Sequence, residues 1–540
     1  MLLRKGWLMI SSIDVCIIIG YLLLMLVIGY YSGKDNKNQE DYFLAGRSMP
    51  WIPIALSVAA TMISANGFIG GPGWAYVDGM YPVMVNITVP LAIFFALSIT
   101  TPVIYKLKIT SIYEYMGLRL GNYSRGLTII QFFINSLIQA SSMVYIPVLI
   151  IQMITGWSLY ALVPIVVLVS IIYTLLGGIK AVIWTDSIQM IVVISAVFIV
   201  IIVALKGMNL SFFDTLQIAQ QSGKLNTFDF SRDISVTNTF WATLIGGTVM
   251  WIRYFCFDQS QVQRVLTSKS LKCAKNSFVV SAFVMNLVYY FMLLVGVILF
   301  VFYGGRTFET SNEIMITFIL NELPVGAIGI IIAGVFAAAM SSIDSILNSM
   351  TTVFTKDIYE FYFKKDNKES SIKVTMIITV VIGVVMTGFI IMGFGGSIKS
   401  ILDLVGNYIS YFAGPATGAF VLAMFTYKAN DKGVSIGFIV GLVLGFFISN
   451  KYNVSWLWNP AIGATITLIF GYIFSVILKK NHNVDDIKKY TAFGMRNHLI
   501  SQGMDKIDGV SIVPFSLGKQ ELIVLAFFII QYIILFLIQF

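Results

Sequence analysis

The stretch AATMISANGFIGGPGWAY, residues 59–76, lies within an apolar segment long enough to cross a membrane. It contains the poor helix formers Asn66–Gly67 and the run Gly70–Gly73, which includes Pro72. Because lipid offers backbone groups no hydrogen-bond partner, unwinding here is tolerated only where protein or a water-filled cavity covers the chain. We expect the helix to unwind and its freed carbonyls to coordinate a cation. The alternative is a kinked helix that packs through its small residues.

The composition of the whole chain is that of a membrane protein. Its 540 residues are 58% hydrophobic and only 11% charged, whereas a soluble protein carries about 25% charged residues. This excludes an ordinary soluble enzyme, a disordered chain and a nucleic-acid-binding protein, and leaves a polytopic membrane protein. The three cysteines have no metal-type spacing, and the chain has only two histidines, His482 and His498, which argues against histidine catalysis.

Apolar segments recur along the chain and predict an all-α fold. We expect fourteen membrane spans, at residues 12–31, 50–77, 80–104, 125–155, 158–178, 184–207, 236–257, 274–303, 322–356, 373–394, 400–425, 433–450, 456–478 and 519–540. Most of the 35 Lys and Arg residues fall in alternate loops, which assigns those loops to the cytoplasm and both termini to the outside of the cell membrane. The first span lacks a following cleavage site, so we expect it to be retained.

A second broken span is predicted at residues 236–257, where Gly246–Gly247 and Arg253 interrupt the apolar sequence and Asp258 follows. The two broken spans occupy equivalent positions in two stretches of five spans, which indicates an inverted-repeat transporter. The expected division is 1–49 (extra N-terminal helix and first cytoplasmic loop), 50–207 (first repeat), 208–235 (extracellular loop), 236–425 (second repeat) and 426–540 (additional helices).

The ninth span, AGVFAAAMSSIDSILNS (333–349), is unusually rich in hydroxyl groups. At 100° per residue, Ala338, Ser341, Ser342 and Ser345 share one helix face. Hydroxyls beside a broken helix would form an oxygen site for a small cation, although serine also occurs in spans simply as a back-bonding residue. Asp186 lies at the start of the sixth span, where the alternative is a solvated first-turn acid.

Five motifs resemble the sodium:solute symporter family. They are EDYFLAGRSMPW (40–51), ISANGFIGGPG (63–73), GGIKAVIWTDSIQ (177–189), DQSQVQR (258–264) and AAAMSSIDSILNS (337–349). The similarity extends in order over about residues 10–480. The resemblance implies a LeuT-type five-plus-five inverted repeat, with one helix before the core and three after it.

The resemblance also implies a function. It is sodium-coupled symport of a small polar organic solute, a sugar or sugar acid, by alternating access in the cell membrane. The alternatives are sodium symport of another small carboxylate, an amino acid or a vitamin. The coupling ion is Na⁺; no organic cofactor, nucleic-acid partner or enzymatic activity is expected, and the lipid-embedded chain is expected to act as a monomer. From another class, a passive ion or solute channel remains an alternative.

Family positions matched residue by residue give two sodium sites. The main site is implied at Ala60, Ile63, Ala338, Ser341 and Ser342. A second sodium, bound by some members, is implied at Asp186, Ser341, Asp344 and Ser345. Asp344 stands where those members have a serine, so it would strengthen this site, form a salt bridge or carry a proton.

The substrate positions are polar but differ from those of the sugar-transporting members. The implied residues are Asn66, Asn86, Gln139, Arg253, Asp258 and Asn407. Neutral amides suit hydroxyl or amide groups. The sialic acid transporters of the family hold the substrate carboxylate with an arginine on the third core helix, and this chain has none there. Arg253 would serve an anion, or it would pair internally with Asp258.

Overall fold

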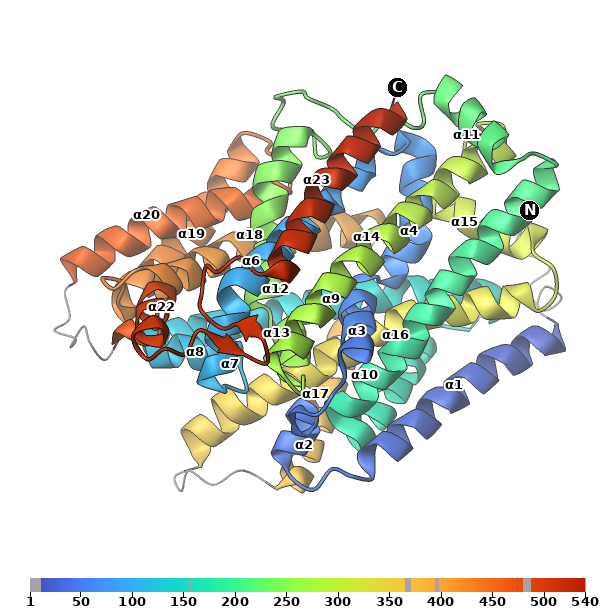
Figure 1. Ribbon diagram of the computed structural model, residues 1–540. Helices are drawn as coiled ribbons and strands as arrows, with labels where there is room; N and C mark the ends of the chain where they lie inside the picture. The colour runs from blue at the N-terminus through green and yellow to red at the C-terminus, as the bar shows by residue number, and fades with distance from the viewer. Residues whose placement is uncertain (1–10, 156, 365–370, 394–397, 479–486, 540) are drawn as a thin grey trace.

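The computed structural model describes residues 11–155, 157–364, 371–393, 398–478 and 487–539, and these residues are almost entirely helical (Figure 1). The α-helices are α1 Ser12–Gly33, α2 Gln39–Leu44, α3 Trp51–Met62, α4 Ala65–Asp78, α5 Met84–Ile87, α6 Val89–Phe95, α7 Thr101–Leu107, α8 Ile112–Arg119, α9 Asn122–Thr155, α10 Leu159–Met208, α11 Phe212–Gln221, α12 Thr248–Phe257, α13 Gln259–Leu266, α14 Leu271–Phe302, α15 Ser311–Glu322, α16 Ala327–Val353, α17 Ile372–Gly393, α18 Ile398–Phe425, α19 Asp431–Lys451, α20 Asn459–Ile477, α22 Ala492–Ser501 and α23 Lys519–Gln539.

Shorter helical segments and one small hairpin complete the described chain. The 3₁₀ and π segments are η1 Ala45–Arg47, η2 Tyr81–Val83, η3 Ala96–Thr100, η4 Ala242–Gly247 and η5 Phe354–Phe363. The hairpin pairs β1 Lys506–Ile507 with β2 Val510–Ser511 in antiparallel register.

Ten helices of the described chain are long and apolar enough to cross a membrane, and α3 with α4 forms one further span bent by 59°. One of the ten, α10, runs for 50 residues where the sequence predicts two spans, 158–178 and 184–207. A helix of that length is about 75 Å long, too long for a single crossing of the roughly 30 Å hydrocarbon layer. It turns at Gly178 (φ 57°, ψ −152°), where a Cβ would lie 2.5 Å from the carbonyl oxygen of Tyr42. The expected total of fourteen membrane spans stays a prediction.

The break in the second predicted span lies earlier than expected. Helix α3 ends at Met62, Ile63 is extended (φ −82°, ψ 93°), and Ser64 caps α4 by accepting a hydrogen bond from the Gly67 amide at 3.4 Å. The expected unwinding over Asn66–Gly73 is wrong, because α4 continues through it to Asp78.

The small residues in α4 instead permit close packing. A Cβ on Gly73 would lie 2.1 Å from the Ser311 carbonyl oxygen, and one on Gly296 of α14 would lie 2.0 Å from that of Pro72. The glycines of this segment therefore let α4 contact α14 and the start of α15 through backbone atoms.

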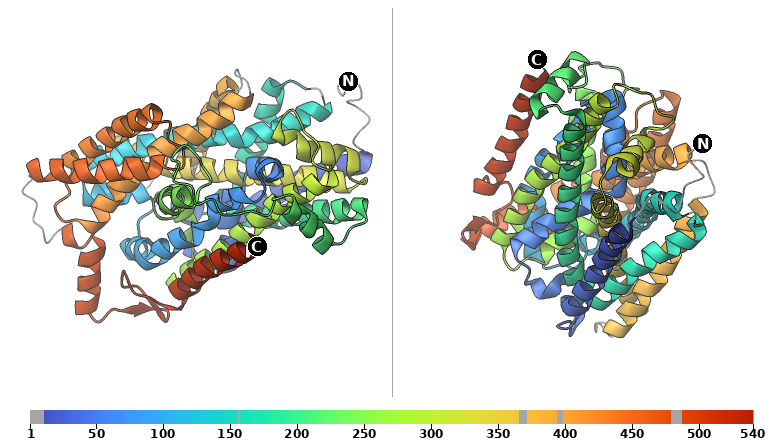
Figure 2. Two further views of the ribbon diagram at one scale, coloured as in Figure 1. Left: turned by 90° about the horizontal axis from the view of Figure 1, so that it is seen from above. Right: turned by 90° about the vertical axis from the view of Figure 1, so that its right-hand side faces the viewer.

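Helix α16 is the centre of the fold. Almost every residue from Ile328 to Val353 is buried, and the helix contacts α1, α3, α9 and α10. Both views in Figure 2 place this yellow segment inside the bundle. Its serines and Asp344 are consequently surrounded by protein on all sides.

Helix α23 lies against α6 and α14 at the surface (Figure 1). Its first turn carries Glu521, which pairs with Lys275 of α14 at 2.7 Å, and both side chains are almost fully buried. Gln531 of the same helix accepts hydrogen bonds from Asn286 (3.1 Å) and Tyr290 (2.8 Å) of α14. Polar contacts thus fix a helix whose other face is apolar and exposed.

Lys275→Met is expected to destabilise the protein by about 3–5 kcal/mol, because it leaves the Glu521 charge buried and unpaired. Adding Glu521→Leu should recover most of that loss. Thermal unfolding in detergent micelles measures both. Lys180→Met is the control: the Lys180–Asp35 pair is exposed, and its loss should cost at most about 1 kcal/mol. Equal unfolding temperatures for Lys275→Met and the double variant would contradict the expectation.

Candidate functional site

The first cluster forms where the end of α3 meets α16. The Ser341 hydroxyl donates to the carbonyl oxygen of Ala60 at 3.2 Å, and the Ser342 hydroxyl donates to that of Thr61 at 3.4 Å. Both serines also lie within 3.2–3.3 Å of the Ala338 carbonyl oxygen. Four of the five residues predicted for the main sodium site are therefore in direct contact.

The fifth predicted residue, Ile63, is buried at the break itself, directly after the last turn of α3. Its amide donates to the Ala59 carbonyl at 3.2 Å. The cluster consists of hydroxyl and carbonyl oxygens and lies in the buried core. Hard oxygen ligands of this kind suit a small cation without d-electron preferences.

A second cluster surrounds Asp186, which is fully buried in the middle of α10. Its Oδ2 accepts hydrogen bonds from the Ser57 hydroxyl at 2.6 Å and from Arg264 Nη2 at 3.0 Å. The alternative of a solvated first-turn acid is wrong, because α10 continues through this position and is covered by α3 and α16.

Arg264 joins this cluster to α16 and is also fully buried. Its Nε donates to the Ser57 hydroxyl at 2.7 Å, its Nη1 to the Ser260 carbonyl at 2.6 Å, and its Nη2 also to the Ser345 hydroxyl. The guanidinium thus lies between Asp186 and Ser345, two of the residues predicted to hold a second sodium ion.

Asp344 is the other carboxylate of this cluster, and it is fully buried. Tyr173 of α10 donates to its Oδ2 at 2.6 Å, and Ser345 donates to its Oδ1 at 3.3 Å. No ion pair to Asp344 occurs in the described part of the chain, which argues against the salt-bridge interpretation. Ser345 also donates to the Ser341 carbonyl, so the four predicted second-site residues do lie together.

Four residues of these clusters were missed by reasoning from the sequence: Ser57, Thr61, Tyr173 and Arg264. Ser57 and Thr61 are polar residues spaced by four in an apolar span, so they share a helix face, and that pattern would have identified them. Arg264 ends the DQSQVQR motif, but it falls between the predicted spans 236–257 and 274–303, where a basic residue is expected in a cytoplasmic loop. Tyr173 carries no distinguishing pattern.

The second broken span separates at Asp258, which is extended (φ −98°, ψ 130°) between α12 and α13. Its Oδ1 caps α13 by accepting from the Ser260 amide (3.0 Å) and hydroxyl (2.6 Å), and its Oδ2 pairs with Arg253 Nη2 at 2.7 Å. The predicted internal pair is present. The break lies later than expected, because the helix continues through Gly246–Gly247 and Arg253 and ends only at Phe257. Each carboxylate oxygen of Asp258 is therefore already engaged by the chain.

The predicted substrate residues whose side chains the structure describes lie on several elements and do not form one bonded group. Asn86 is buried on α5, while Asn66 on α4 and Gln139 on α9 are half-buried. No hydrogen bond joins the side chains of these three within the described chain, and the Asn66 Oδ1 atom has no partner there. The side chain of Asn407 lies outside the described residues.

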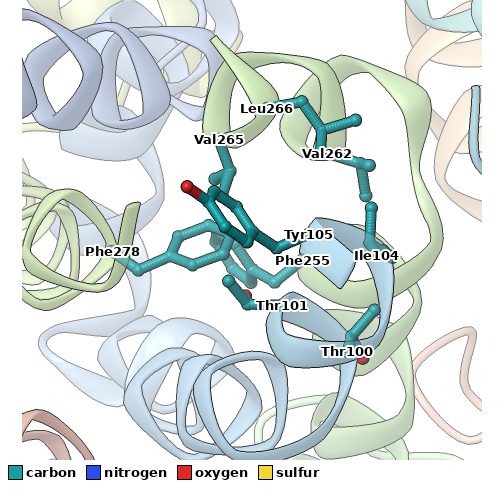
Figure 3. Close-up of a pocket in the computed structure, with 9 residues that line it drawn as sticks. All are labelled: Thr100, Thr101, Ile104, Tyr105, Phe255, Val262, Val265, Leu266 and Phe278. Carbon is teal, nitrogen blue, oxygen red and sulfur yellow. The ribbon is translucent and has the colours of Figure 1, made fainter. Parts of the chain in front are cut away.

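Two apolar cavities lie near the second break. One, of about 10 Å³, is lined by Thr100, Thr101 and apolar side chains such as Phe255 and Phe278 (Figure 3); it has room for about one water molecule. The other, of about 440 Å³, is lined mainly by apolar residues, Phe257 and Phe515 among them. Neither cavity contains a predicted substrate residue.

The sequence of this chain is similar to that of known sodium symporters. The sequence profile of the sodium:solute symporter family matches residues 42–441. The sodium/sialic acid symporter NanT of Aliivibrio fischeri is 27% identical over 497 residues, covering 89% of this chain and 96% of that protein. The sodium/sialic acid symporter SiaT of Proteus mirabilis is 29% identical over 489 residues, covering 88% of this chain and 97% of that protein.

The fold is shared as well. The solved structure of a Na⁺-coupled sialic acid symporter, in its substrate-bound outward-open state, matches with a TM-score of 0.77 at 27% identity and covers 86% of this chain and 98% of that one. The helices thus have the LeuT-type arrangement of sodium-coupled symporters. Since the family profile spans most of the chain, this protein belongs to the sodium:solute symporter family, whose members are transporters and not enzymes.

Proposed function

We propose that this protein takes up a small polar organic solute, a sugar or sugar acid, by sodium-coupled alternating access. One observation carries the proposal: the hydroxyls of Ser341 and Ser342 lie against the carbonyls of Ala60 and Thr61 where the α3–α4 span breaks. An oxygen site between two helices lets a bound cation favour one arrangement of those helices, which is the requirement for coupling.

The main sodium site consists of Ala60, Ile63, Ala338, Ser341 and Ser342. It is supported by the contacts between the end of α3 and the hydroxyl face of α16. Sodium here bridges the two helices and replaces their direct hydrogen bonds.

A second sodium site at Asp186, Ser341, Asp344 and Ser345 is supported by charge. The cluster contains two buried carboxylates, Asp186 and Asp344, and one guanidinium, that of Arg264, which pairs with Asp186. The cluster therefore carries one excess negative charge when both acids are ionised, and a monovalent cation would neutralise it. The structure of the sialic acid symporter revealed a novel Na⁺ site in that protein.

The substrate is recognised by neutral amides, Asn66, Asn86, Gln139 and Asn407, which suit hydroxyl-rich solutes. The Arg253–Asp258 pair takes part when substrate draws Arg253 away from Asp258. Two of the bacterial relatives are sodium/sialic acid symporters, which supports a sugar acid. The alternatives are another small carboxylate, an amino acid or a vitamin.

The protein acts as a monomer in the cell membrane with both termini outside. The orientation is supported by the concentration of Lys and Arg in alternate loops. Its two repeats are residues 50–207 and 236–425. Sodium entry then supplies about 2.3 kcal/mol per 100 mV of membrane potential and about 1.4 kcal/mol per tenfold sodium gradient. Together these sustain a roughly 500-fold substrate gradient for one sodium.

In sealed proteoliposomes with an inward sodium gradient, the purified protein should accumulate its substrate above the external concentration. A channel would only equilibrate it, so equilibration at the external level would contradict symport. Candidate substrates are chosen beforehand by a thermal-shift screen of sugars, sugar acids, amino acids and vitamins, with and without sodium. The substrate should raise the unfolding temperature only in sodium.

Ser342→Ala should lower the apparent sodium affinity of uptake about tenfold or more. The variant removes one oxygen ligand of the ion, and a polar contact to a charged group contributes about 1.5–3 kcal/mol to binding. The sodium concentration at half-maximal uptake measures this. Ser349→Ala is the matched control, since among the residues that the structure describes the Ser349 hydroxyl bonds only the Ser345 carbonyl of its own helix. Wild-type sodium affinity in Ser342→Ala, with normal folding, would overturn the assignment of the site.

A further inference from the structure

Helix α13 is a short polar helix buried on every side. All eight of its residues, Gln259–Leu266, are buried, although five of them are polar. Burial of so many polar side chains requires specific partners, since each unpaired group costs free energy. The partners of α13 therefore reveal what holds it in place.

Gln263 fastens α13 to two other elements. Its Nε2 lies 2.8 Å from the Phe43 carbonyl oxygen of α2, 2.8 Å from Asn348 Oδ1 and 2.9 Å from Thr352 Oγ1 of α16. All three side chains of this polar group are fully buried. The side-chain amide of Gln263 thus links α13 to the part of α16 that follows the serine cluster.

Arg264 fastens the same helix to three others: to Ser57 of α3, to Asp186 of α10 and to Ser345 of α16. Asp186 and Ser345 are themselves proposed ligands of the second sodium ion, and Ser57 and Ser345 each connect through one helical turn to the main sodium site. The Ser57 carbonyl accepts from the hydroxyl of Thr61, whose own carbonyl meets Ser342. The Ser345 hydroxyl donates to the carbonyl of Ser341.

We propose that α13 is a latch that closes the cytoplasmic side of the transporter, and that Arg264 is the positioning residue that ties this latch to sodium. The proposal rests on the sodium site and the orientation proposed above. Sodium bridges α3 to α16 and so fixes the distance between Ser57 and Ser345. At that distance the guanidinium of Arg264 contacts both hydroxyls. When sodium leaves, α3 and α16 separate, Arg264 loses one of the two contacts, and α13 is released.

The chain contains a native reporter for this movement. Cys273, at the start of α14, is buried, with its Sγ 3.5 Å from the Met49 carbonyl oxygen. Met49 in turn pairs with the loop after α13, its amide donating to Thr267 at 3.0 Å and its carbonyl accepting from Lys269 at 3.3 Å. Release of α13 therefore uncovers Cys273. The other two cysteines, Cys16 and Cys256, can be replaced by serine and alanine.

The test measures the rate at which a maleimide labels Cys273 in this background, in vesicles that expose the cytoplasmic face, with sodium or choline chloride. Sodium should slow labelling about tenfold. Arg264→Gln should label at the sodium-free rate in both salts and should permit a sodium-independent, equilibrating substrate flux. Gln261→Leu is the matched control on the same helix, because within the described chain the side chain of Gln261 bonds only Tyr254 of α12; it should keep full sodium protection.

Arg264→Lys keeps the Asp186 charge paired and so preserves folding, but one ammonium cannot reach Ser57 and Ser345 together. Sodium protection should fall to about threefold in this variant. If sodium still protected Cys273 fully from maleimide in either Arg264 variant, the latch would be overturned, whatever the transport activity of that variant. Sodium-dependent uptake by the wild type without any sodium effect on Cys273 would overturn the latch and leave the proposed function standing. Sodium protection of Cys273 without sodium-driven accumulation would instead overturn the proposed function.

Discussion

The break between α3 and α4 is the constraint on which the rest of the site depends. Inside a membrane, a helix that stops at Met62 leaves carbonyl groups that water cannot reach, so other parts of the protein must satisfy them. Ser341 and Ser342 do this from α16. Because that contact is possible only if α16 passes beside the break, the buried position of α16 and the packing of α10 against it follow from the same requirement.

The two clusters differ in what they contribute. The serines beside Ala60 provide neutral hydroxyl oxygens, to which a cation can bind without displacing another charged group. Around Asp186, a guanidinium already balances one carboxylate, and Asp344 adds a second. The clusters share the turn from Ser341 to Ser345. An ion bound at the first cluster therefore changes the surroundings of the second, and through Arg264 those of α13.

Much of the site was predictable from residue type and spacing. Hydroxyls that recur on one face of a buried helix identify Ser341, Ser342 and Ser345, and the polar interruption at Asp258 identifies the second break. The first break was misplaced, because Asn66 and the glycines after it are poor helix formers in isolation. In the protein Ser64 caps α4, and the glycines serve close contacts with α14 and α15. Local propensity cannot distinguish a glycine that breaks a helix from one that lets two helices touch.

The sequence by itself determined that this is a polytopic α-helical membrane protein with two interrupted spans and an oxygen-rich helix, because composition and periodicity depend only on which residues follow one another. Only the tertiary structure decided which charges meet. For Asp186 the sequence left a solvated position open, and Arg264 falls in a predicted loop. In the structure the two side chains form a fully buried ion pair, although they lie 78 positions apart in the sequence. Ion pairing between distant segments is set by how helices pack in space, and no spacing rule along the chain encodes it.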